Sequence, residues 1–176
     1  MTKWFMTRAA AITTSVLLGV GSVGAADTAK GNHPDQKFFK EAAQGGMAEV
    51  TLGQMAVNKA ESEAVKTFGQ QMITDHGKAN QELKDLAGSE GVTLPTELSA
   101  DAKRLQTKLS GLSGAAFDKA YMKEMLKDHK KAISAFKREA EQGQDPEVKN
   151  WAAKTLPTLQ EHYTVAQATS NEIGMK

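Results

Sequence analysis

The sequence contains no cysteine among its 176 residues. This absence excludes a disulfide framework, a lipid-modified cysteine, a thiolate metal ligand and a cysteine nucleophile. No serine lies in a recognisable nucleophile elbow or triad either. Stability must therefore come from an apolar core. A domain of about 150 residues, the length that remains without the N-terminal segment discussed below, is long enough to bury one substantial core.

The chain also lacks a strong net charge of either sign, because it contains 22 basic and 21 acidic residues. Proteins that bind nucleic acids generally concentrate basic residues on one face, so this balance predicts no nucleic-acid partner. The lysine-rich stretch 123–137 is most simply explained as a solvated helix face. No protein or small-ligand partner can be named from the composition.

The first 26 residues have the pattern of a signal peptide. Lys3 and Arg8 precede the apolar run 9–20, and small residues at 22–26 suit cleavage after Ala25 or Ala26. The apolar run is shorter than the roughly 20 residues that a membrane span needs. We therefore expect a signal peptide over 1–26, a flexible leader over 27–34, one domain over 35–176, no permanent membrane anchor, and a periplasmic or secreted protein.

Apolar residues recur at steps of three and four over four long segments, 35–59, 62–88, 115–142 and from 145 onward, which predicts amphipathic helices. Ser62 and Asp145-Pro146 are typical helix starts. Gly45 and Gly46 indicate either close helix packing or a break, and Pro157 predicts a kink or a local break. The predicted core residues are Phe39, Phe68, Met72, Leu83, Phe117, Met125, Phe136 and Leu159.

The segment between the second and third long helices, 88–114, contains a shorter amphipathic stretch over 99–109. It is much longer than the 2–8 residues that usually join neighbouring antiparallel helices. It could therefore cross the length of the bundle, although an up-down arrangement stays open. No segment alternates apolar and polar residues as a strand would, so the sequence predicts an all-α fold.

Four stretches carry a resemblance to a known family: FFKEAAQGGMAEVTLGQMA, VKTFGQQMITDHGKANQEL, LSGAAFDKAYMKEMLKDHKKAI and LPTLQEHYTVA. They resemble an uncharacterised family of exported bacterial proteins, often described as outer membrane proteins, that is placed with the ferritin-like four-helix bundles. The resemblance covers about residues 35–170. It implies a ferritin-like four-helix bundle, here with an extra short helix between helices two and three, and it brings no settled activity.

Three histidines lie on the apolar stripes of three different predicted helices. His76 is four residues after Met72, His129 is four after Met125, and His162 is three after Leu159. Each histidine follows an acid, namely Asp75, Asp128 or Glu161. Neighbouring helical residues point about 100° apart, so such an acid could support only a histidine on another helix.

Together with the inward Glu49, the three histidines form a candidate metal set of Glu49, His76, His129 and His162. One carboxylate and three imidazoles suit zinc or another divalent first-row ion. The alternative is that each histidine is a core residue bonded to a carboxylate, a carbonyl or a tyrosine. The acids and tyrosine expected in the same polar network are Asp75, Asp118, Tyr121 and Asp128.

Depth along the bundle tests whether the candidate ligands can meet. At about 1.5 Å per residue, Glu49 and His76 lie roughly 17 Å and 23 Å from the first turn. His129 and His162 lie roughly 22 Å and 28 Å from the last turn. An up-down bundle would place His76 and His129 in one layer, whereas a crossover would bring His129 near Glu49 and leave His162 in a different layer.

The sequence argues against a ferritin-like oxidoreductase, because Ile73, Leu126 and Leu159 stand where Glu-x-x-His motifs would need glutamate. We therefore expect a non-enzymatic periplasmic bundle that binds a partner or acts in envelope stress. The alternative is a bundle that binds a divalent metal through its inward histidines.

Overall fold

The computed structural model describes residues 33–175 as five helices, and the described residues contain no strand. The helices are α1 (Gln36–Lys59), α2 (Glu63–Ser89), α3 (Ala100–Ser110), α4 (Gly114–Gln142) and α5 (Pro146–Glu172). These bounds confirm the four long helices and the short helix expected from the sequence. The predicted signal peptide and residues 27–32 of the predicted leader lie outside the described residues.

Local sequence explains where two of the helices begin. The Asp145 carboxylate accepts hydrogen bonds from the backbone N–H groups of Glu147 and Val148, and Pro146 follows at the first helical position. The Ser99 hydroxyl accepts from the Ala102 N–H in the same way at the start of α3. Side-chain capping therefore satisfies backbone donors that would otherwise have no partner inside these helices.

Ser62 stands at the N-cap position of α2, but its side chain makes no capping bond. Instead Asp118 of α4 accepts from the backbone N–H groups of Glu61 and Ser62, at 3.1 Å and 2.8 Å. Asp35 acts similarly at the other end, where it accepts from the N–H groups of Gln144 and Asp145. A carboxylate that is distant in sequence, Asp118 of α4 or Asp35 just before α1, thus satisfies the backbone of each of these two turns.

Neither of the two positions at which the sequence allowed a break interrupts its helix. α1 runs without a break through Gly45 and Gly46, and α5 continues through Pro157. Packing along a whole helix outweighs the cost of one glycine, about 1 kcal/mol, or of one lost backbone donor. Gly46 and Gly53 serve close packing, whereas Gly45 does not: a Cβ at Gly46 would overlap the Asn80 side chain, and a Cβ at Gly53 would lie 2.7 Å from the Gly69 carbonyl oxygen of α2.

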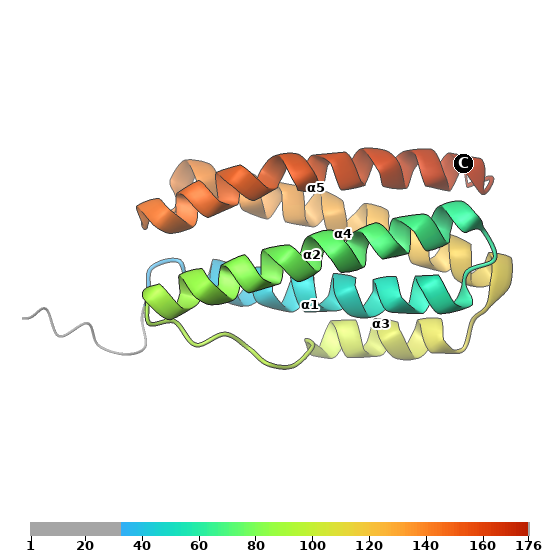
Figure 1. Cartoon of the computed structure of the whole chain (residues 1–176), viewed down its shortest axis with the longest axis horizontal. Helices are drawn as coiled ribbons and strands as arrows, with labels where there is room; N and C mark the ends of the chain where they lie inside the picture. The colour runs from blue at the N-terminus through green and yellow to red at the C-terminus, as the bar shows by residue number, and fades with distance from the viewer. Residues whose placement is uncertain (1–32, 176) are drawn as a thin grey trace, which may run out of the picture.

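The long helices pair as two antiparallel hairpins, α1 with α2 and α4 with α5 (Figure 1). The connection from α2 to α4 runs back along the bundle and includes α3, which lies beside α1 (Figure 1). Consequently the α1–α2 turn lies next to the start of α4, where Ala115 N–H bonds to Glu61. The topology is therefore the crossover, with the two hairpin turns at opposite ends of the bundle.

The interior contains two apolar clusters, one toward each end of the bundle. The first includes Phe68, Met72, Phe117, Tyr121 and Met125, and the second includes Phe39, Leu83, Phe136 and Leu159. All eight predicted core residues are buried, which confirms the faces assigned from the apolar periodicity. Between the clusters lies a polar layer, because His76 follows Met72 and precedes Leu83, and His129 follows Met125 and precedes Phe136.

Candidate metal centre

Three histidines from three helices meet in this polar layer. His76 of α2, His129 of α4 and His162 of α5 are all buried, with exposed fractions of 9%, 1% and 1%. Their ring centroids lie 5.3 to 5.7 Å apart. One ring nitrogen from each histidine lies within 4.8 Å of those from the other two.

Each histidine has one buried ring nitrogen with no hydrogen-bond partner among the described residues. These atoms are Nε2 of His76, Nε2 of His129 and Nδ1 of His162. A buried polar atom that lacks a partner costs about 1–3 kcal/mol. Three such atoms, one from each histidine of the layer, are therefore unusual for a core made only for stability.

The second ring nitrogens of His129 and His162 are engaged, and their partners determine the tautomers. His129 Nδ1 lies 2.9 Å from the carbonyl oxygen of Met125. A carbonyl only accepts, so Nδ1 carries the proton and Nε2 keeps its lone pair. His162 Nε2 lies 2.9 Å from Asp75 Oδ2, and donation to this carboxylate leaves the lone pair on Nδ1.

The contact between Asp75 and His162 joins α2 to α5. Asp75 precedes His76 in sequence, but its carboxylate serves the histidine of the other hairpin, as the angle between helical neighbours requires. A carboxylate behind a histidine is the usual support for a metal ligand, because it orients the ring and makes the opposite nitrogen more basic.

Burial keeps the free lone pairs unprotonated. Desolvation, followed by repulsion from His129 and His162, lowers the pKa of His76 to about 3. Desolvation likewise lowers the pKa of His129 to about 4, although the bond to Met125 opposes this effect. At neutral pH both imidazoles are therefore neutral, which is the form that binds metal ions.

Glu49 of α1 lies beside the histidines but outside the group of three. Its Oε1 is 3.8 Å from His129 Nδ1, the nitrogen already directed at Met125, and its buried Oε2 has no partner among the described residues. Burial, with a smaller contribution from Asp128, raises the pKa of Glu49 to about 8. The structure thus places Glu49 next to the centre rather than among the three converging nitrogens.

Of the other residues expected in the polar network, Tyr121 and Asp128 lie near Glu49, whereas Asp118 lies elsewhere. The buried hydroxyl of Tyr121 has no partner among the described residues, and burial together with the charge of Glu49 raises its pKa well above the usual value. Asp118 does not join the histidines, because it binds the backbone of the α1–α2 turn. Asp128 is half-buried and acts on Glu49 through its charge.

The donor set fits a divalent transition ion. Zinc binds imidazole nitrogens at about 2.0–2.1 Å, so the donors of one tetrahedral site are about 3.3 Å apart. The three nitrogens, within 4.8 Å of one another, need only a modest contraction to reach this spacing. Three histidine ligands also leave a fourth position open.

Sequence reasoning missed a second cluster formed by His33, Glu90 and Asp145. His33 Nε2 lies 3.8 Å from Glu90 and 4.0 Å from Asp145. However, His33 Nδ1 accepts a hydrogen bond from the Asp35 N–H, so the proton of a neutral ring is on Nε2, facing the two carboxylates. The two carboxylates lie near the ring without a hydrogen bond to it, and no periodic pattern in the polar segment around His33 signalled the cluster.

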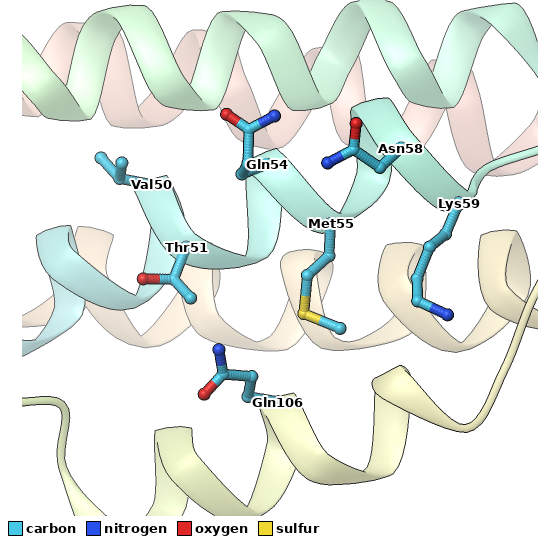
Figure 2. A pocket seen from close by; sticks show the side chains of 7 residues that line it. All are labelled: Val50, Thr51, Gln54, Met55, Asn58, Lys59 and Gln106. Atoms are coloured by element: carbon cyan, nitrogen blue, oxygen red, sulfur yellow. The ribbon is translucent and has the colours of Figure 1, made fainter.

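A hollow of about 430 Å³ lies between α1 and α3 (Figure 2). Met55 of α1 and Gln106 of α3 project into the space between these helices (Figure 2). The only charged lining residue is Lys59, whose Nζ donates to the carbonyl oxygens of Ser110 and Leu112. This hollow therefore offers no set of converging ligands comparable with the histidine layer.

Comparisons with known proteins place the chain in a family of unknown function. The family model described as a domain of unknown function, DUF4142, matches residues 20–169. The chain belongs to this family. No curated protein matches this DUF4142 chain.

The fold of this DUF4142 chain is similar to that of a solved structure. The crystal structure of a DUF305 fragment from Deinococcus radiodurans superposes with a TM-score of 0.70 at 13% identity, covering 80% of this chain and 97% of the other. At this identity the likeness concerns the helical fold alone. Among the described residues, no helix combines the length and the apolar character that crossing a membrane requires.

Proposed function

We propose that this protein binds one divalent first-row transition ion, such as Zn²⁺, through His76, His129 and His162. Two observations carry this proposal: one ring nitrogen of each histidine lies within 4.8 Å of those from the other two, and each ring has a buried nitrogen with no hydrogen-bond partner among the described residues. Imidazole is a preferred ligand for zinc, copper, nickel and iron ions.

Hydrogen bonding within the group cannot replace the ion. His129 Nε2 and His162 Nδ1 are both acceptors, given the tautomers that Met125 and Asp75 impose. A neutral His76 has a single N–H and can therefore satisfy only one of these two acceptors. A cation at the centre would accept all three lone pairs at once.

Charge also favours a divalent ion. Asp75 lies behind His162, and Glu49 lies beside His129. Burial raises the pKa of Glu49 to about 8, so a bound dication would displace its proton, and the resulting carboxylate would offset part of the charge of the ion. Water or the Glu49 carboxylate would complete the fourth position.

The proposed activity is binding rather than catalysis. The positions three residues before the histidines hold Ile73, Leu126 and Leu159, so the carboxylates that would hold a di-iron pair are missing from these helices. With the signal-peptide pattern of residues 1–26, we propose an exported, periplasmic bundle of the ferritin-like type that binds a metal ion. A role in envelope stress would be consistent with such a protein.

Titration of the metal-free protein with Zn²⁺ tests the proposal, with Co²⁺ as a spectroscopic probe of coordination. We expect one ion per chain and Co²⁺ absorption bands typical of nitrogen coordination. His129→Gln should weaken binding at least a hundredfold, whereas His33→Gln, which changes the histidine outside the group, should leave it unchanged. No binding by the wild type, or equal losses in both variants, would refute the proposal.

A further inference from the structure

A groove between α1 and α4 collects positive charge on a chain that is almost neutral overall. Its lining includes Lys37 from α1 and four cations from α4, namely Lys127, Lys130, Lys131 and Arg138, with Glu41 as its one carboxylate. We call these residues, together with Ser134 and Ala135, the basic groove. The whole chain carries a formal charge of only +1, so this concentration of cations is local.

Three of these cations form no ion pair within the part of the chain that the structure describes. Lys37 approaches Glu41 at 3.9 Å, and Lys127 bonds to Glu124 at 3.1 Å. Lys130, Lys131 and Arg138 have no carboxylate oxygen within 4.0 Å among residues 33–175. The charges of Asp128 and Glu139 reach Lys131 and Arg138, but without direct contact.

The groove is a shallow, open hollow with small side chains between its cations. Its volume is about 520 Å³, and Ser134 and Ala135 lie between the cations on α4. From Lys127 to Arg138 the helix rises about 16 Å, at 1.5 Å per residue. An extended peptide advances about 3.3 Å per residue, so about five residues would span this distance.

We propose that the basic groove binds an extended acidic segment of a partner protein. Carboxylates along such a segment would face cations from two helices, and the small side chains leave room for its backbone. Exposed ion pairs are individually weak and screened by salt, so the association should be weak, reversible and sensitive to ionic strength.

An anionic membrane is the less suitable occupant. Helices that lie on membranes place tryptophan, phenylalanine or leucine beside their cations so that these side chains enter the lipid. The only apolar residue in the lining of the basic groove is Ala135.

Fluorescence anisotropy with labelled decaglutamate tests the proposal on the folded protein. The groove variant is Lys130→Gln, Lys131→Gln, Arg138→Gln. The matched control, Lys78→Gln, Lys84→Gln, Lys119→Gln, removes the same charge from exposed positions outside the groove. Circular dichroism and Zn²⁺ titration verify that each variant keeps the fold and the histidine layer.

We expect the wild type and the control to bind the peptide within about twofold of each other at low salt, and to release it at high salt. The groove variant should bind at least about tenfold more weakly, as the loss of three weak pairs implies. Equal losses in both variants, or no peptide binding by the wild type, would overturn the proposal. So would binding to phosphatidylglycerol vesicles without binding to the peptide.

Discussion

Asp75 and His162 are joined by a 2.9 Å contact between Oδ2 and Nε2 that links α2 to α5. Because Nε2 donates to Asp75, the buried Nδ1 of His162 keeps its lone pair free. The acid thus acts on the site through a histidine from the other hairpin, and not through His76, its neighbour in sequence.

Replacing Asp75 by Asn should weaken zinc binding about 10- to 100-fold, the usual effect of losing a carboxylate behind a ligating histidine. The amide can still occupy the position, but it lacks the negative charge that holds the N–H of His162. Competition with a coloured chelator would measure the change. Asp85→Asn, an exposed change on the same helix, is the control, and an equal loss there would show that Asp75 has no special role.

Zinc should raise the melting temperature of the metal-free protein. At a free concentration a hundredfold above Kd, binding to the folded state adds about 2.7 kcal/mol. For a domain of this size the midpoint should rise by about 5–10 °C in a calorimetric scan.

The double variant His76→Ala, His129→Ala should show no such rise, and a chelator should leave its melting temperature unchanged. A wild type whose melting temperature responds to neither zinc nor chelator would speak for a purely structural histidine layer. In that case the two substitutions should still be non-additive, because the rings share one interior.

The metal-free protein should lose stability in mild acid because of its buried histidines. The pKa values of His76 and His129 are about 3 and about 4, below the ordinary 6.5. Their contribution to the free energy of unfolding is therefore complete above pH 6.5. It is lost as the pH falls toward 4, because the unfolded chain then binds protons that the folded chain does not.

Denaturant titrations at several pH values would measure this loss against the variant His76→Gln, His129→Gln. Below pH 6.5 the difference in unfolding free energy should shrink by up to about 2.7 kcal/mol per pH unit. Glu49, whose raised pKa has the opposite effect on stability, is present in both proteins, so its effect largely cancels in the difference between them. A difference that does not change between pH 6.5 and 5 would contradict the shifted pKa values.

Gly53→Ala should destabilise the bundle by about 1–3 kcal/mol, because its Cβ would press on the backbone of α2. The nearest atom, the Gly69 carbonyl oxygen, would be only 2.7 Å away, and a backbone atom cannot move aside cheaply. In Gly45→Ala of the same helix, no atom lies within 4 Å of the new Cβ.

The Gly45→Ala control should therefore be neutral or gain up to about 1 kcal/mol from better helix propensity. Urea unfolding would compare the two variants under the same conditions. If Gly53→Ala is as stable as Gly45→Ala, α1 and α2 pack less closely than the structure indicates.

The apolar periodicity of the sequence was sufficient to predict the helices and the core residues, because both depend on local spacing along the chain. Phe68 and Phe136 are buried as expected, and Asp145 caps α5. Roles that depend on distant contacts could not be predicted. Asp118, expected near the histidines, instead binds the α1–α2 turn, and nothing in the sequence around it indicates this.

Whether the three histidines meet could not be predicted without the structure, because His76 lies on a different hairpin from His129 and His162. Counting residues from the turns put His162 in a different layer from His129 under the crossover arrangement, yet the two ring centroids are 5.4 Å apart. Both histidines lie on the α4–α5 hairpin and were counted from the same turn, so the difference of roughly 6 Å in depth does not depend on topology; the count ignored the reach of the imidazole rings along the bundle. The sequence could identify the inward histidines, but not the level at which the hairpins dock.

The crossover divides the candidate ligands between the two halves of the molecule. His76 belongs to the α1–α2 hairpin, and His129 and His162 belong to the α4–α5 hairpin, while helix packing is far more extensive within each hairpin than between them. An ion in the layer would therefore link the two hairpins through their histidine side chains. Because such coupling is reciprocal, any force that separates the halves would release the ion, and removal of the ion would loosen their union.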